Sequence, residues 1–252
     1  MKIKAEYKVK LTGEVIWGYK IEEKIWQGAT STIYKGISLN GPGKYGKIIA
    51  IKVLHPYRKD PLQIRQFLKE IKIQKRLNHP NIVKVYKGGK FNGFLFMFAE
   101  YVDGKSLRMV AQRKEIPFEK VIHIMVEVGK GLSYIHKRGI IHNDIKPENI
   151  IVSKDFDVVK LTDFGYAEKL RGFLKSHSLP GGTERYMAPE RKKGNYDFRS
   201  DIYSLGRVFE ELLKKEIDSP EIYEIIIKAT HQEPSKRYQT VEEFIEKLRN
   251  LL

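Results

Sequence analysis

Apolar residues in this chain change their spacing once, near Tyr101, and that change limits the folds it can adopt. Before this point, residues 15–25, 33–38 and 47–54 alternate apolar with polar side chains, which is the period of a β-strand. After it, apolar residues recur at helical spacing. The sequence therefore predicts an α+β protein with a strand-rich N-terminal part and a larger, mainly helical C-terminal part.

Turn residues divide the N-terminal part into hairpins. Residues 3–11 predict a first strand, and Thr12-Gly13 provides the turn that follows it. Residues 40–46 are rich in Gly and predict the turn of a second hairpin. Two further strands are expected at residues 82–86 and 93–99. Their hairpin signals are Gly88-Gly89 and Asn92-Gly93.

One helix is expected among these strands and several after them. Residues 61–77 place one face of a helix against the core, and we expect that face to contain Ile64, Phe67, Leu68, Ile71 and Gln74. Further helices are predicted at residues 118–137, 201–214, 220–230 and 240–251. We interpret residues 1–252 as one domain with an N-lobe (1–99), a hinge (100–105) and a C-lobe (106–252). Ligands favour the cleft that such lobes would enclose.

The composition limits which binding partners and which cellular compartment we expect for this protein. A hydrophobic content of 41% in 252 residues supports a sizeable core. The net charge of +16 favours anionic partners such as nucleotides, acidic or phosphorylated proteins, nucleic acids or acidic membrane surfaces. The absence of Cys excludes disulfides. Lysines interrupt the first ten residues, and no run reaches membrane-spanning length, so a cytoplasmic protein is predicted.

The most informative segment is residues 142–149, His-Asn-Asp-Ile-Lys-Pro-Glu-Asn. Phosphoryl transfer needs a carboxylate to receive a hydroxyl proton, a cation near the moving charge and an oxygen ligand for a metal ion. Asp144, Lys146 and Asn149 supply these three groups. Pro147 prevents a regular helix here, which places the groups on a rigid loop. Asp163, in the Asp-Phe-Gly triplet 163–165, adds a second carboxylate suited to Mg²⁺.

These two segments resemble the catalytic loop and the Asp-Phe-Gly element of the eukaryotic-like (Hanks-type) serine/threonine protein kinase family. The resemblance implies the two-lobed kinase fold, with a small antiparallel sheet and one main helix in the N-lobe and a larger, mainly helical C-lobe. It also implies ATP and Mg²⁺ as cofactors. By this resemblance Asp144 is the catalytic base, Lys146 contacts the moving phosphate, and Asn149 and Asp163 are the metal ligands.

The resemblance extends over nearly the whole chain. Residues 50–53, Ala-Ile-Lys-Val, resemble the family's third-strand element, which implies that Lys52 binds the α- and β-phosphates and pairs with Glu70. Residues 182–183 and 188–190 resemble the end of an activation segment. Residues 200–206 resemble the buried helix of the lower lobe, and Arg237 is the expected partner of Glu190. The implied nucleotide-binding residues are Gly28, Ile33, Ala50, Lys52, Ala99, Glu100, Val102 and Ser106.

The sequence departs from the family at several positions. Residues 26–31 keep only Gly28 of the glycine-rich loop that cradles phosphate. Asn143 replaces the arginine that grips a phosphate on the activation segment, so we hypothesise activity without phosphorylation of that segment, whose hydroxyls include Ser176, Ser178 and Thr183. Ala99 is small where the family often has a larger residue, which predicts an open cavity behind adenine. The 36 residues (237 − 201) between Asp201 and Arg237 are few for the family.

The resemblance implies an enzyme that transfers the γ-phosphate of ATP to serine or threonine hydroxyls of proteins and of itself. The basic residues Arg185, Arg191, Lys192 and Lys193 favour acidic or phosphorylated substrates, and ordinary solvated surface charge is the alternative. Three alternatives to the enzyme stay open. They are a pseudokinase that acts as a nucleotide-binding scaffold, a small-molecule kinase, and a nucleic-acid-binding protein, the last being the least favoured because no recognition module is apparent.

Overall fold

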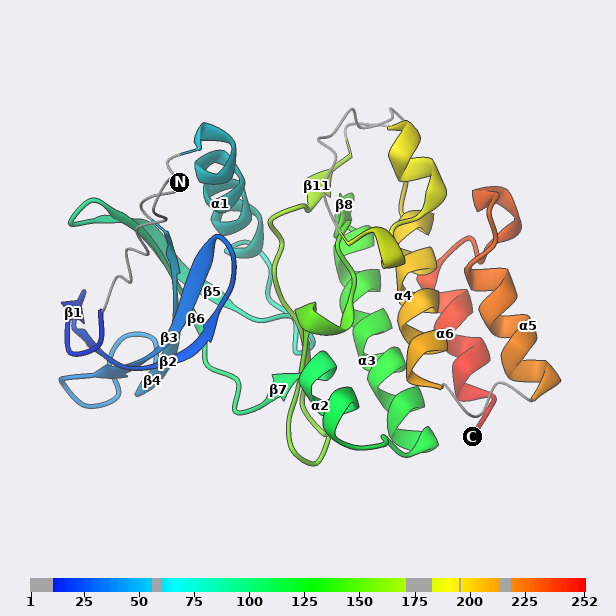
Figure 1. Ribbon diagram of the computed structural model, residues 1–252, viewed down its shortest axis with the longest axis horizontal. Coiled ribbons are helices and arrows are strands. Elements are labelled where there is room, and N and C mark those ends of the chain that lie inside the picture. The colour runs from blue at the N-terminus through cyan, green and yellow to red at the C-terminus, as the bar shows by residue number, and fades with distance from the viewer. Residues whose placement is uncertain (1–10, 56–59, 171–182, 195, 214–218) are drawn as a thin grey trace, which may run out of the picture. The chain divides into compact units, whose positions relative to one another are not determined.

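The computed structural model describes residues 11–55, 60–170, 183–194, 196–213 and 219–252. The chain separates into two compact units (Figure 1). The first contains the chain up to Leu77 together with Lys84–Val102, and the second contains Asn78–Val83 and the chain from Asp103 onward. The short segment before Lys84 joins the second unit because its backbone pairs with β10 (Val159–Leu161): the Val83 N–H donates to the Leu161 carbonyl at 2.9 Å.

The first unit is built on an antiparallel sheet of six strands in the order β1-β2-β3-β4-β6-β5. The strands are β1 (Val15–Ile16), β2 (Tyr19–Gln27), β3 (Ser31–Ser38), β4 (Ile48–Leu54), β5 (Val85–Phe91) and β6 (Phe94–Glu100). One face buries Ile21, Tyr34, Ile51 and Phe98 in a core. Trp17 and Tyr19 both pack edge-on against the Phe98 ring, an arrangement that aromatic pairs favour.

Two strand predictions are wrong in detail. Residues 15–25 form two strands, because Trp17 and Gly18 turn the chain at φ values of 47° and 85°. Gly88-Gly89 lies inside β5 and not in a turn, and the hairpin turns at Asn92-Gly93 alone. A Cβ on Gly88 would lie 2.5 Å from Cδ1 of Ile71, so this glycine allows close packing. Most of the strand predicted at residues 3–11 lies outside the described residues.

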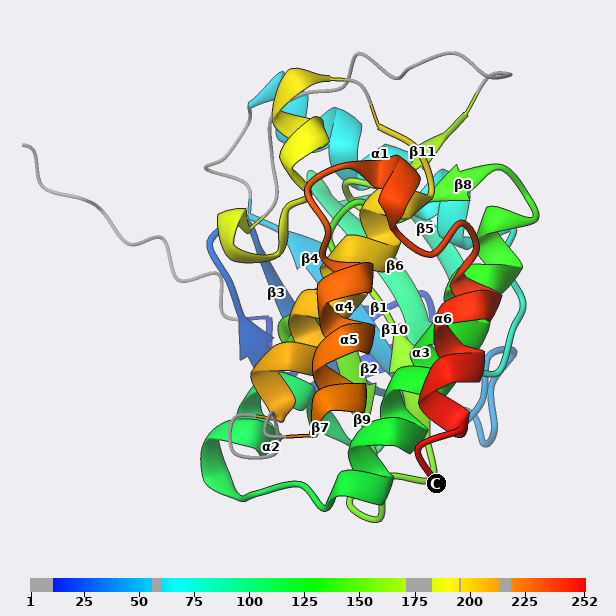
Figure 2. The same ribbon diagram turned by 90° about the vertical axis from the view of Figure 1, so that its right-hand side faces the viewer.

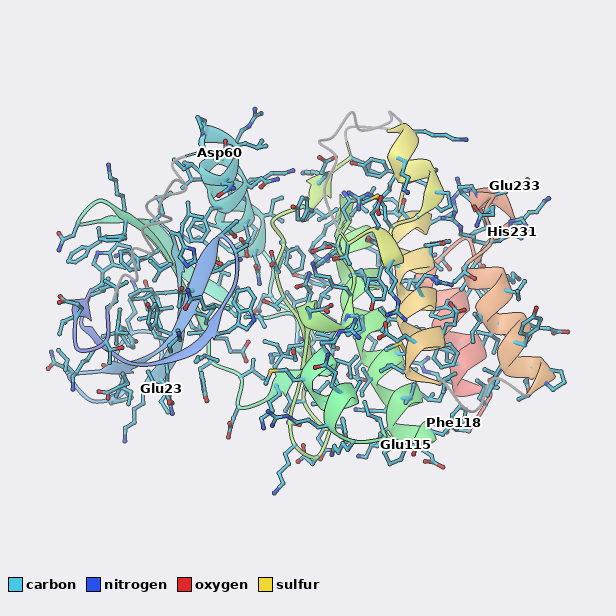
Figure 3. The ribbon with its side chains drawn as sticks, viewed as in Figure 1. Glu23, Asp60, Glu115, Phe118, His231 and Glu233 are labelled. Carbon is cyan, nitrogen blue, oxygen red and sulfur yellow. The ribbon has the colours of Figure 1, made fainter. Side chains whose placement is uncertain are left out.

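Helix α1 (Pro61–Gln74) belongs to the same unit. Asp60, labelled in Figure 3, caps its N-terminus by accepting the Leu62 N–H at 2.9 Å, and Pro61 fits the first turn because its nitrogen needs no partner there. Phe67, Glu70 and Ile71 are buried. Leu68 is 45% exposed, so its predicted place on the buried face is wrong.

The second unit contains α2 (Leu107–Arg113), α3 (Phe118–His136), α4 (Arg199–Leu212), α5 (Pro220–Ala229) and α6 (Val241–Arg249). Helix α3 packs against α4 and α6, and α5 lies in front of α4 in Figure 2 and also contacts α6 (Figures 1 and 2). The prediction missed α2, whose seven residues are too few to show a period. Short strands complete the unit: β7 (Lys105–Ser106), β9 (Ile150–Val152) and β10 form one sheet, and β8 (Ile140–Ile141) pairs with β11 (Glu168–Lys169).

Single-turn 3₁₀ helices shape the connections of the second unit: η1 (Pro147–Asn149), η2 (Glu184–Tyr186), η3 (Pro189–Lys193) and η4 (Pro234–Lys236). No helix among the described residues combines the length and hydropathy that crossing a lipid bilayer requires.

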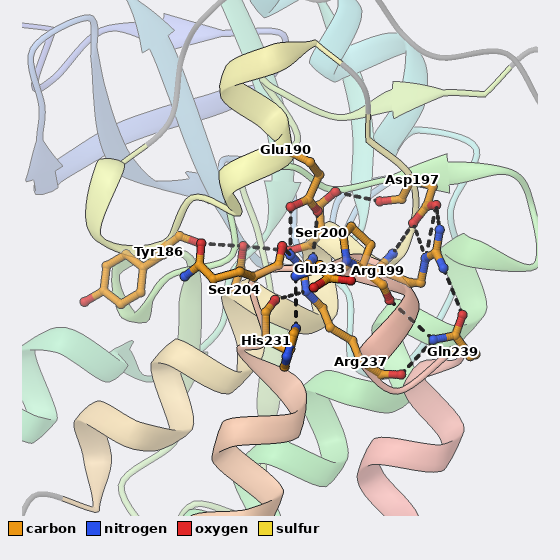
Figure 4. Close-up of polar contacts among 12 residues, drawn as sticks. Tyr186, Glu190, Asp197, Arg199, Ser200, Ser204, His231, Glu233, Arg237 and Gln239 are labelled. Atoms are coloured by element: carbon orange, nitrogen blue, oxygen red, sulfur yellow. Dashed lines mark hydrogen bonds and ion pairs between the residues drawn. The ribbon is translucent and has the colours of Figure 1, made fainter.

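The side chain of Arg237 lies inside the second unit and contacts several of its connecting segments (Figure 4). Its fully buried guanidinium donates to both carboxylate oxygens of Glu190, at 2.7 Å each, and to the carbonyls of Arg199 and His231. The expected pairing of Arg237 with Glu190 is confirmed. These hydrogen bonds compensate the buried charge of Arg237. They also connect η3 to the start of α4.

Helices α3 and α6 pack closely at Gly129, where a Cβ would lie 2.2 Å from Cγ2 of Ile245. We expect Gly129→Ala to lower the free energy of unfolding by about 1–3 kcal/mol through overpacking, less roughly 1 kcal/mol gained in helix propensity. Chemical denaturation of Gly129→Ala, Ile245→Ala and the double variant measures this. The double variant should lose less than the sum of the two single losses, and additive losses would contradict the contact.

Candidate active site

Three predicted residues meet in the loop between β8 and β9. The Asp144 carboxylate is 6% exposed, lies 2.7 Å from Nζ of Lys146 and accepts a hydrogen bond from Nδ2 of Asn149 at 2.9 Å. Nδ2 of Asn149 also donates to the Asp144 carbonyl at 2.8 Å. The structure therefore presents a carboxylate, a cation and an amide in direct contact, and these are the groups that phosphoryl transfer requires.

Asp201, in the first turn of α4, fixes the position of this loop through hydrogen bonds. Its carboxylate is fully buried and accepts the backbone N–H of His142 at 2.8 Å and of Asn143 at 2.9 Å, and a bond from Nε2 of His136 at 2.9 Å. Burial acts to raise the pKa of Asp201, but the hydrogen bond and charge of His136 outweigh it and the pKa is lowered. The carboxylate is thus ionised and fixes the backbone just before Asp144.

His142 is a neutral ring in this loop. Burial lowers its pKa, although Asp201, Asp144 and Asp163 act in the opposite direction. Its contacts define the tautomer: Nε2–H donates to the Thr162 carbonyl at 3.2 Å, and Nδ1 accepts the Asp144 N–H at 3.3 Å. The ring packs against Phe164, with centroids 4.6 Å apart. His142 therefore connects the loop to the Asp-Phe-Gly triplet.

Asp163 follows β10 and lies next to the loop. The Thr162 N–H donates to the Asn149 carbonyl at 2.9 Å, which aligns the two segments, and Asp163 has a φ of 63°. Asn149 directs its amide nitrogen at Asp144, so its side-chain oxygen is left to act as a ligand. The donor set of these residues is all oxygen, which suits Mg²⁺. No group of three or more His, Asp or Glu that could hold a metal by itself occurs among the described residues.

The first unit contains the other two charged residues that the sequence predicts for the site, Lys52 and Glu70. Nζ of Lys52 on β4 lies 2.7 and 2.9 Å from the two carboxylate oxygens of Glu70 on α1, and Glu70 is 2% exposed. The expected ion pair is therefore present. It fixes the direction of the Lys52 side chain, because a buried carboxylate with two short contacts restricts the flexible lysine stem.

Four of the predicted nucleotide-binding residues share one face of the sheet. Ile33 pairs with Lys52 across β3 and β4, and Ala50 pairs with Ala99 across β4 and β6. Paired residues point to the same face, as do residues two apart on a strand. The opposite face carries the apolar core. The small side chains of Ala50 and Ala99 thus lie on the same face of the sheet as the ammonium group of Lys52.

The remaining nucleotide-binding predictions are placed as follows. Gly28 lies in the β2–β3 turn under the ring of Trp26, and a Cβ there would come within 2.0 Å of the ring, so a larger residue would require the exposed Trp26 side chain to move. The Glu100 N–H donates to the Lys84 carbonyl at 2.8 Å. Ser106 caps α2 by accepting the Met109 N–H at 3.4 Å. Val102 is half-buried where the first unit ends.

Two clusters escaped the sequence analysis. Arg191 on η3 was expected to meet substrate, but its guanidinium donates to the Asn143 carbonyl. Arg108 on α2 donates to Glu148 at 2.7 Å, and also to Glu211 and the Tyr186 hydroxyl. Burial and the Glu211 carboxylate raise the pKa of Tyr186 to about 12. No local pattern signals either cluster. The residues in contact lie 40 or more positions apart, except Tyr186 and Glu211, which are 25 apart.

The segment that follows the Asp-Phe-Gly triplet is described only at its ends. Lys146 donates to the Thr183 hydroxyl at 3.1 Å, which places this threonine beside the candidate catalytic groups. Ser176 and Ser178 lie outside the described residues.

Comparison with known proteins agrees with this fold. The protein kinase domain model matches residues 19–252. The chain is 33% identical to a probable serine/threonine-protein kinase of Clostridium perfringens over 90% of its length, covering 37% of that protein, and 36% identical to PknL of Mycobacterium tuberculosis over 77%, covering 49%. The chain thus spans less than half the length of these curated relatives.

Solved structures give the same result. The kinase domain of Mycobacterium tuberculosis PknI superposes with a TM-score of 0.74 at 25% identity, covering 96% of this chain and 99% of that domain. A double mutant of the same domain gives 0.76 at 26% identity, covering 95% and 98%. The predicted kinase fold is confirmed, and the chain belongs to the protein kinase family.

We expect Asp201→Asn to lower the free energy of unfolding by about 1.5–3 kcal/mol at pH 7, because two buried N–H donors lose a charged acceptor. The pKa of Asp201 is lowered in the folded state. Its contribution is therefore complete above its ordinary value of about 3.9 and is lost as the pH falls through the lowered value. Denaturant unfolding from pH 8 to pH 3 should show a constant difference in the free energy of unfolding between wild type and variant above pH ~5, and this difference should become smaller in acid. A difference that grows in acid would contradict this.

Proposed function

We propose that this chain is an ATP-dependent protein kinase that phosphorylates serine or threonine. The contact between Asp144, Lys146 and Asn149 is the observation that carries the proposal. Burying a carboxylate carries a desolvation cost even where a cation and an amide compensate it, so packing alone would favour an apolar side chain at this position. Membership of the kinase family and the names of the relatives support the same activity.

Asp144 is the proposed catalytic base. It accepts the proton of the substrate hydroxyl as that oxygen bonds to the γ-phosphorus, while the bond from this phosphorus to the bridging oxygen breaks and ADP leaves. Lys146 compensates the negative charge that moves across the phosphoryl group. The Asn149 hydrogen bond keeps the carboxylate in one orientation. Positioning of this kind supplies much of the catalysis in phosphoryl transfer, which requires little covalent chemistry from the protein.

ATP and Mg²⁺ are the proposed cofactors. Lys52, oriented by Glu70, binds the α- and β-phosphates, and the sheet face of Ile33, Ala50 and Ala99 receives the adenine. Asn149 and Asp163 would hold the metal ion, which would supply positive charge to neutralise the phosphates. Gly28, Glu100, Val102 and Ser106 complete the proposed nucleotide site.

Protein substrates with acidic or phosphorylated side chains are proposed, and the enzyme is proposed to act in the cytoplasm. The side chains of Arg185 and Lys192 are 58% and 60% exposed near Thr183, so they are accessible to a substrate. Among the described residues each has a carboxylate neighbour at a long distance: Arg185 lies 3.7 Å from Glu211, and Lys192 lies 3.4 Å from Glu184. An acidic peptide group can therefore compete for both.

The decisive experiment is incubation of the protein with labelled Mg-ATP and a positional peptide library. We expect label on serine or threonine, with acidic residues preferred nearby. Asp144→Asn should lower kcat on the order of 10²- to 10⁴-fold because the base is lost, while the affinity for Mg-ATP stays similar.

Asp155→Asn is the matched control, since Asp155 is in the exposed turn between β9 and β10 and bonds only locally with Ser153 and Asp157 in the described structure. Its turnover should equal that of the wild type. Nucleotide binding without any turnover in the wild type would instead identify a pseudokinase, and label on a small molecule but no peptide would identify a small-molecule kinase.

Ala99 provides a test of the proposed adenine site. It is 6% exposed and pairs with Ala50, so a larger side chain there would fill the space next to this face. We expect wild type to bind ATP analogues enlarged on the base, and Ala99→Phe to lose that binding while retaining ATP. Competition binding measures both affinities. Equal affinity of wild type and variant for the enlarged analogue would place adenine elsewhere.

A further inference from the structure

The peptide plane between Asn143 and Asp144 is held at both of its polar ends. The carbonyl of Asn143 accepts a hydrogen bond from the Arg191 guanidinium, and the N–H of Asp144 donates to Nδ1 of His142 at 3.3 Å. These two groups belong to one rigid plane, so fixing both sets its rotation. That rotation decides the direction in which the Asp144 side chain leaves the backbone.

The conformation of Asn143 makes this support important. Its φ of 68° lies in the left-handed region, which few residues other than glycine adopt. Asn tolerates this region better than most residues, and contacts with neighbours stabilise it further here. Three elements contact it: Asp201 accepts its N–H, its side-chain amide donates to the Tyr166 carbonyl at 3.2 Å, and Arg191 binds its carbonyl. The bonds with Asp201 and with Arg191 each involve a charged group, and such bonds are the stronger kind.

Arg191 is itself held in place from a second direction. Its guanidinium lies over the ring of Tyr196, 5.4 Å from the centroid, and the Tyr196 hydroxyl donates to Glu168 at 2.8 Å. Glu168, on β11, pairs with Ile141 at the end of β8. The contacts therefore form a closed path from β8 through Glu168, Tyr196 and Arg191 back to Asn143.

We propose that Arg191 is a positioning residue that orients Asp144 through the Asn143 carbonyl, and that this arginine makes the orientation independent of phosphorylation. The inference rests on the proposed kinase function. The charge that holds the loop is a permanent part of η3, and every contact on the path lies outside residues 171–182. A phosphate added between β11 and Thr183 is therefore not needed to complete it.

Steady-state kinetics on wild type, Arg191→Met and Arg191→Lys test the proposal. We expect Arg191→Met to lower kcat on the order of 10- to 100-fold, as a small misplacement of the base does. KM for ATP and for peptide should stay within about twofold, because neither ground-state binding step uses the Asn143 carbonyl. Arg191→Lys should recover part of kcat by restoring a charged donor. Wild type treated with phosphatase until its mass shows no phosphate should retain its kcat.

Arg249→Met is the control: its guanidinium pairs with Glu246 at 3.1 Å on α6, and its kcat should be unchanged. Thermal unfolding of each variant monitors folding, and Arg191→Gln replaces Arg191→Met in the comparison if the latter does not fold. An unchanged kcat, or a raised peptide KM at wild-type kcat, would overturn the positioning role and leave Arg191 as a substrate contact. Loss of activity after phosphatase would overturn the independence from phosphorylation. Absence of turnover in the wild type would instead reject the proposed function itself.

Discussion

The buried carboxylate of Asp201 is the interaction on which the second unit depends. Burying a charge without compensation would cost several kcal/mol, about as much as the whole fold can tolerate. Here two backbone N–H groups and the His136 ring compensate it. The same hydrogen bonds remove the freedom of the loop that carries Asp144. Stability of the helical unit and geometry of the candidate base therefore have one physical origin.

The catalytic loop is held by polar contacts from several elements because it cannot hold itself. It is short, it contains Pro147, and Asn143 adopts a positive φ, so it has no regular backbone pairing of its own. Helix α4 supplies Asp201, η3 supplies Arg191, and the end of β10 supplies the Thr162 carbonyl that binds His142. Each contact satisfies a backbone or ring group that would otherwise be buried without a partner.

Local chemistry also explains how far the sequence predicted the structure. The helices of the second unit were placed to within a few residues because their apolar faces repeat over several turns. The contact among Asp144, Lys146 and Asn149 could be predicted because the three residues are close together in one proline-containing loop. Leu68 was placed on the wrong face and Gly88-Gly89 in a turn, because an isolated helix or glycine pair does not reveal what will pack against it. Helix α2 was missed because it is too short to repeat.

The sequence by itself determined the fold class, the family and the residue types available for phosphoryl transfer, because each depends on patterns spaced within one helix, strand or loop. Only the tertiary structure decided which side chains support them. Arg191 reads as one of several surface cations in sequence, yet it binds the carbonyl before Asp144, 48 positions away. Contacts of this length depend on how whole elements pack, and packing is set by all the side chains together rather than by any local pattern.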